Sequence, residues 1–101
     1  MVSSLTPASR EAIVQELLST APVFQGNDSI ARALERPGGI DFERLLNYGH
    51  WCTGEYLVLL AAAHIAGATV DGQPVEIDEH ELWYRLDSGN YAAVRAALDS
   101  L

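Results

Sequence analysis

Residues 57–70 form the most apolar stretch of the chain, with His64 inside it. A helix that is apolar on nearly every side is stable only when it is buried. The stretch is shorter than the roughly 18 to 20 residues that a membrane-spanning helix requires. Thr53 suits the start of such a helix, Glu55 suits its first turn, and Gly67 is a typical end. We therefore predict a central buried helix over residues 53–66.

Helix-capping residues recur before and after this segment, which indicates a mostly helical chain. The predicted caps are Thr6 (with Pro7 at the first helical position), one of Asn27, Asp28 and Ser29, then Asp41, Asp78 and Asn90. Breaks are expected at Ala21-Pro22, Pro37-Gly38-Gly39 and Asp87-Ser88-Gly89. Apolar residues at helical spacing follow the caps: Ala12, Ile13, Leu17 and Leu18 with Val14 beside them, Phe42, Leu45 and Leu46 with Tyr48 and Gly49, Leu82, Trp83 and Leu86, and Tyr91, Val94, Leu98 and Leu101.

Residues 68–77 differ from the rest, because an Asp71-Gly72 turn lies between residues that favour β-structure. Pro74 weakens a strand there, so a small hairpin and an irregular loop both remain open. With 101 residues, the chain has the length of one domain. We predict a single helical domain over residues 1–101. Its fold class is all-α, a compact bundle of five to six short helices around the central one.

Basic residues are absent from the middle of the chain. No Arg or Lys lies between Arg44 and Arg85, and the formal net charge at pH 7 is −8. Lys and Arg are the residues that bind phosphate groups and nucleic acids, so we expect no nucleic-acid partner. A large negative charge favours basic partners, although it can also serve solubility alone.

We expect a cytoplasmic protein with no membrane partner. Residues 1–7 lack the charged and apolar segments of an export signal. The single cysteine, Cys52, forms no internal disulfide, which suits a reducing compartment. All the basic residues are arginine and alanine is frequent, a composition that fits a bacterial genome rich in G and C.

Four potential metal ligands are His50, Cys52, His64 and His80. Zinc is held by thiolate and imidazole groups, but the spacing of these four matches no zinc motif. A lone histidine on an apolar helix is more often a core residue with a hydrogen-bonded ring. We therefore predict no metal site and no cofactor. The alternative is a small metal- or thiol-dependent protein that uses His50, Cys52 and His64 or His80.

Cys52 precedes the predicted central helix, where a helix N-terminus favours the nucleophilic thiolate form. No catalytic motif surrounds it, so we interpret Cys52 as a small buried hydrophobic residue beside Trp51. Glu55 is a weaker candidate for acid–base chemistry, since a first-turn glutamate ordinarily stabilises the helix end. We predict no catalytic residue.

Amphipathic aromatic residues are numerous for so short a chain, and Trp and Tyr are favoured in protein-binding surfaces. The predicted contact surface combines Trp83 and Tyr84 with Asp78, Glu79 and Glu81. The competing interpretation is that Trp83 anchors its helix to the core while the acids face water. We predict a non-enzymatic interaction or regulatory module whose partner is another protein, basic in character, or a second copy in a homodimer. Mimicry of nucleic acid by the acidic face is a third hypothesis.

Overall fold

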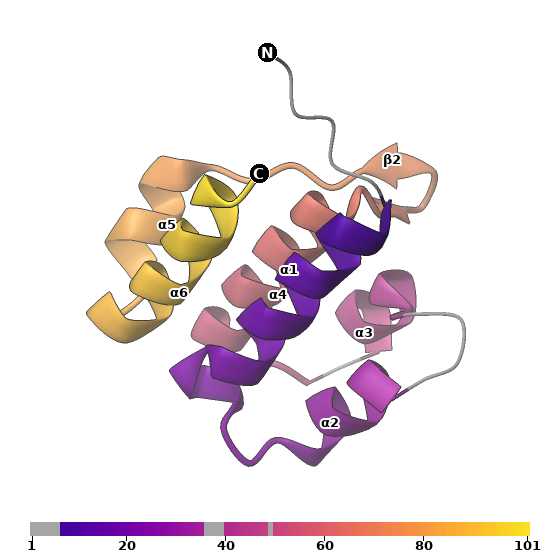
Figure 1. The fold of residues 1–101 in the computed structure, drawn as a ribbon, viewed down its shortest axis with the longest axis horizontal. Coiled ribbons are helices and arrows are strands. Elements are labelled where there is room, and N and C mark those ends of the chain that lie inside the picture. The colour runs from indigo at the N-terminus through magenta and orange to yellow at the C-terminus, as the bar shows by residue number, and fades with distance from the viewer. Residues whose placement is uncertain (1–6, 36–39, 49) are drawn as a thin grey trace.

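The computed structural model describes residues 7–35, 40–48 and 50–101. The helices and strands of these residues are α1 (Pro7–Thr20), the 3-10 helix η1 (Pro22–Phe24), α2 (Asp28–Glu35), α3 (Phe42–Tyr48), α4 (Thr53–Ala66), β1 (Thr69–Val70), β2 (Gln73–Pro74), α5 (Glu79–Arg85) and α6 (Ser88–Asp99). The prediction of an all-α bundle with five to six helices is confirmed (Figure 1). The radius of gyration of 12.8 Å is close to the roughly 13 Å of a compact chain of this length.

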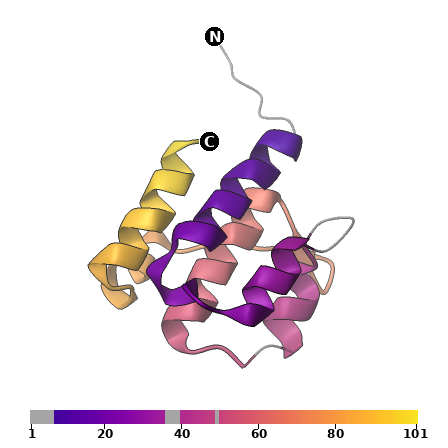
Figure 2. The same cartoon turned by 60° about the horizontal axis from the view of Figure 1, so that its bottom comes forward.

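Helix α4 is the centre of the bundle and packs against α1, α3, α5 and α6. Leu59, Ala62 and Ile65 are fully buried along it, as expected of a helix that is apolar on nearly every side. Helix α1 runs antiparallel to α4, so that the start of α1 lies beside the end of α4. There the Nη1 of Arg10 donates to the backbone oxygen of Ile65, 2.9 Å away. Figure 2 shows α1 lying between α6 and α2 on the outside of α4.

Every α-helix described contributes to one hydrophobic core. The largest fully buried side chains are Leu17, Leu18, Ile30, Leu59, Ile65, Val14, Val58 and Val94. The predicted apolar face of α1 is wrong at one position, since Ala12 is exposed while Val14 is buried. The buried face of α1 is therefore formed by Val14, Leu17 and Leu18.

The caps of α2 and α3 follow the sequence prediction. Asn27 accepts from the backbone N–H of Ile30 at 3.1 Å, and Asp41 accepts from that of Arg44 at 3.1 Å. The prediction of Gly67 as the end of α4 is also confirmed, since this residue has a φ of 72°, a conformation that costs glycine little. Four predictions lie outside the described residues, namely those for Thr6, Pro37-Gly38-Gly39, Gly49 and the side chain of Tyr48.

Two caps differ from the prediction by a few residues. Helix α4 is capped by Cys52 and not by Thr53, which is already helical. Helix α6 is capped by Asp87, whose side chain accepts from the backbone N–H of Asn90 at 2.8 Å. Asn90 itself is buried and accepts from the backbone N–H of Val23 at 3.0 Å. The side chain of Asn90 therefore joins α6 to η1, and a nearer residue is left to cap the helix.

Residues 68–77 contain the small hairpin that the sequence left open. Strands β1 and β2 pair antiparallel, with Val70 opposite Gln73 and Thr69 opposite Pro74. Asp71 and Gly72 have φ values of 54° and 77°, the left-handed conformation that a two-residue hairpin turn of type I′ requires at both positions. Pro74 is tolerated because a two-stranded sheet leaves one edge of each strand unpaired. Among the described residues, no helix has the length and apolar character needed to cross a membrane.

Candidate functional site

Helix α5 is attached to the bundle along one side. Its start is capped by Asp78, whose Oδ1 accepts from the backbone N–H groups of His80 (2.9 Å) and Glu81 (3.3 Å), which confirms this predicted cap. Leu82 and Leu86, four positions apart, are buried. Residues at this spacing share one helix face, so the other faces of α5 are directed toward solvent.

The aromatic residues of the predicted contact surface lie on these open faces. Trp83 is 65% exposed and Tyr84 is 81% exposed. The ring of Trp83 rests edge-on against Tyr91 of α6, with ring centroids 5.1 Å apart. Tyr84 lies beside His80, at a centroid distance of 6.3 Å. The prediction that Trp83 belongs to the apolar side of its helix is therefore wrong, because Leu82 and Leu86 alone supply that side.

The three predicted acidic residues differ in the intramolecular contacts that they form. The Oδ1 of Asp78 caps α5, as described above. Glu79 forms an ion pair with Arg95 of α6 at 2.9 Å, and Glu81 lies 3.6 Å from Arg85 on the next turn of α5. Glu79 therefore contributes to joining α5 with α6, and its charge is balanced from within. The carboxylate of Glu81 stays exposed, and so does the guanidinium of Arg85 beside it.

Arg95 is the cationic centre of the α5–α6 contact. Its guanidinium donates to Asp99 at 2.7 Å and to Glu79 at 2.9 Å. These two acceptors, Asp99 first, raise the pKa of Arg95 above its ordinary value. A raised pKa means that the stabilisation is fully present below the ordinary arginine pKa and is lost only as pH rises through the higher folded value. The ion pairs therefore persist with a charged guanidinium throughout the neutral range.

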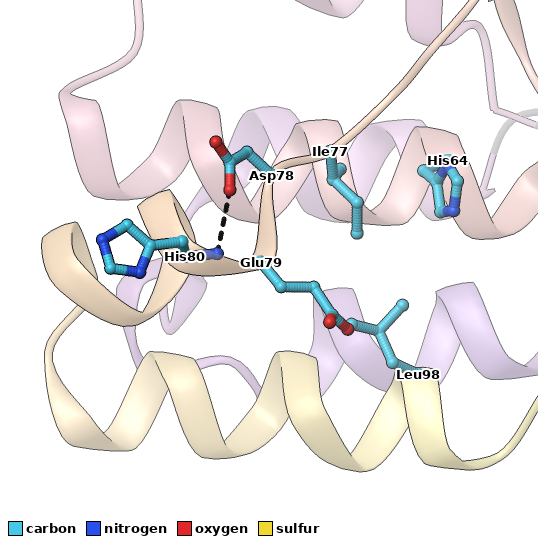
Figure 3. Close-up of a pocket in the computed structure, with 6 residues that line it drawn as sticks. All are labelled: His64, Ile77, Asp78, Glu79, His80 and Leu98. Carbon is cyan, nitrogen blue, oxygen red and sulfur yellow. Dashed lines mark hydrogen bonds between the residues drawn. The ribbon is translucent and has the colours of Figure 1, made fainter.

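Two of the potential metal ligands, His64 and His80, line one open cavity of about 640 Å³. Figure 3 shows Ile77 and Asp78 between them, with the His80 ring pointing away from His64. His64 is exposed, and its Nδ1 lies 2.9 Å from the backbone oxygen of Val75. A carbonyl oxygen only accepts, so Nδ1 carries the proton in this bond. The prediction for His64 is wrong about burial and right about a backbone partner.

The other two potential ligands, His50 and Cys52, precede α4 and are exposed. The interpretation of Cys52 as a buried hydrophobic residue is wrong, because the cap position lies at the outer end of the helix. Glu55 accepts from the backbone N–H of Cys52 at 2.9 Å and from the side-chain amide of Asn27 at 3.5 Å. Within the described part of the chain, no group of three or more His, Cys, Asp or Glu side chains is placed to hold a metal ion.

Sequence reasoning missed a recess between α4 and α5, named here the α4–α5 recess. Its volume is about 270 Å³. The apolar residues that line it are Leu57, Leu60, Ile77 and Leu82, and the acidic ones are Glu76, Asp78 and Glu81. The signal that could have indicated it is the apolar character of α4 on nearly every side, because short neighbouring helices cover such a surface incompletely.

Comparisons of the chain with protein-family models, with curated proteins and with solved structures find no match. We therefore infer the function of the chain from the geometry of α5 and its surroundings.

Proposed function

We propose that this protein is a non-enzymatic binding module and that the open face of α5, carrying Trp83 and Tyr84, is its contact surface for another protein. The observation that carries the proposal is the high exposure of two adjacent large aromatic side chains, 65% and 81%. Large aromatic residues are usually buried at least in part, and in binding surfaces they supply most of the affinity. The partner is basic in character, since the chain carries a net charge of −8.

The support of α5 favours this function. Leu82 and Leu86 fix the helix to the core, and the ring of Tyr91 supports Trp83 from the side. A contact residue that is held in place before binding loses less conformational freedom when the partner arrives. The cytoplasmic location and bacterial origin expected from the sequence are part of the same proposal.

Native mass spectrometry of the protein purified gently from its own host tests the proposal. We expect a complex with a second protein for the wild type and the mass of the bare chain for Trp83→Ala/Tyr84→Ala. A matched control is Leu101→Ala, which removes a 47% exposed apolar side chain away from α5. A complex that survives the double substitution, or a small excess mass that a chelator removes, would contradict the proposal. The second result would favour the metal-dependent alternative.

A further inference from the structure

The α4–α5 recess combines an apolar floor with an acidic rim. We infer that it receives an apolar side chain from a basic amphipathic helix of the partner, whose Lys or Arg residues pair with Glu76, Asp78 and Glu81. This inference rests on the proposed function and adds a second contact region to it, beside the exposed aromatic face of α5. An amphipathic helix in an apolar groove is a common mode of protein recognition.

The floor of the recess belongs to a side of α4 that its neighbours cover only in part. Leu57 is 6% exposed and Leu60 is half-buried. Tyr56, four positions before Leu60 and therefore on the same helix face, is 41% exposed. These residues extend the apolar surface along α4 beyond the recess itself, as a helical ligand with side chains on successive turns requires.

The rim of the recess carries more negative charge than the protein balances, since only Glu81 of its three acids has an arginine nearby in the part of the chain that the structure describes. No arginine lines the recess, and no Arg or Lys occurs between Arg44 and Arg85 in the sequence. Among the described residues, Glu76 has no ion-pair partner. Arg85 near Glu81 is itself largely exposed. Charge complementarity of this kind selects a cationic partner and speeds its encounter.

Size and charge argue against two other occupants. A volume of about 270 Å³ lies below the roughly 300 to 1,000 Å³ of typical small-molecule sites, so the recess fits a protruding side chain better than a cofactor. A second copy of this chain would bring another net charge of −8, and two such chains repel one another.

The probe is a synthetic amphipathic helical peptide with Leu on one face and Lys on the other. A peptide with Glu in place of Lys is its charge-reversed counterpart. Titration calorimetry measures the dissociation constant at physiological salt. We expect Glu76→Gln/Glu81→Gln to weaken binding of the Leu/Lys peptide by about tenfold, as for two partly screened ion pairs. The matched control, Glu11→Gln/Glu16→Gln on the exposed side of α1, removes the same charge and should change binding less than about twofold. Equal effects of the two pairs would overturn the inference, because attraction to net charge alone would explain them.

A second pair of variants tests the apolar floor. Leu60→Lys places a cation in the recess, and Leu101→Lys makes the same change at a C-terminal residue that is 47% exposed. We expect Leu60→Lys to weaken binding of the Leu/Lys peptide by at least about tenfold, with little effect of Leu101→Lys. Peptide binding that tolerates Leu60→Lys would overturn the inference.

The results separate the inference from the proposed function. If the host complex depends on Trp83 and Tyr84 while substitutions in the recess leave peptide binding unchanged, the inference fails and the proposed function stands. If no host complex depends on these aromatics, the proposed function fails whatever the peptide does. A doubled mass that Leu60→Lys abolishes would show a homodimer through the recess and would overturn the basic-helix inference.

Discussion

Asn90 shows how one buried polar side chain joins two distant parts of the chain. It is 5% exposed, and its Oδ1 accepts from the backbone N–H of Val23, which follows α1. Replacing it with alanine leaves the partly buried N–H of Val23 without its acceptor. The sequence predicted Asn90 as the helix cap and Asp87 as part of the preceding turn, although both residue types favour the cap position. A tertiary partner decides between them, and no local pattern reveals it.

We expect Asn90→Ala to lower the free energy of unfolding by about 1–3 kcal/mol, the usual cost of an unsatisfied buried polar group. Urea denaturation measures this change. The matched control is Asn47→Ala at an exposed position of α3, which should stay within about 0.5 kcal/mol of the wild type. Equal costs for the two substitutions would show that the Asn90–Val23 bond does not contribute to stability.

At the scale of elements, the sequence predicts the helices well because their ends carry local signals. Asp41 and Asp78 cap the helices predicted for them, and Gly67 ends α4. Helix η1 was missed because Pro22 indicates only a break in α1. The sequence left open whether Trp83 is exposed or anchors its helix to the core, because spacing alone does not give the width of an apolar stripe. Both depend on the neighbours that each segment meets after folding.

Helix α5 offers a direct comparison of an anchoring residue with a contact residue. We expect Leu82→Ala to lower the free energy of unfolding by about 2–5 kcal/mol, because it removes a side chain that is 2% exposed. Trp83→Ala should cost only about 1 kcal/mol, the value of its edge-on contact with Tyr91. Urea denaturation of both variants measures the difference. A Trp83→Ala variant as unstable as Leu82→Ala would make Trp83 a core residue and remove it from the binding surface.

On the scale of the whole molecule, charge distinguishes a basic partner from a second copy. The net charge of −8 attracts a cationic protein and repels an identical chain, and added salt screens both effects. The total charge was readable from the sequence. The balance of Glu79 by Arg95 and the open rim of the α4–α5 recess were not, because they depend on how α5 packs against α4 and α6.

We expect the complex with the host partner to weaken as NaCl rises from about 0.05 to 0.5 M, since the Debye length falls below about 10 Å over this range. Analytical ultracentrifugation at several salt concentrations measures the association. Association that strengthens with salt, in a preparation of the chain alone, would instead indicate a homodimer whose repulsion is screened.

Photocrosslinking inside the host tests whether the open face of α5 contacts another protein. A photoreactive phenylalanine analogue replaces Tyr84 in one strain and Gln15, an exposed residue of α1, in another. We expect a covalent adduct with one second protein from position 84 and none from position 15. An equal yield of adducts from both positions, or no protein adduct from position 84, would contradict the claim that the open face of α5 is a protein-binding surface.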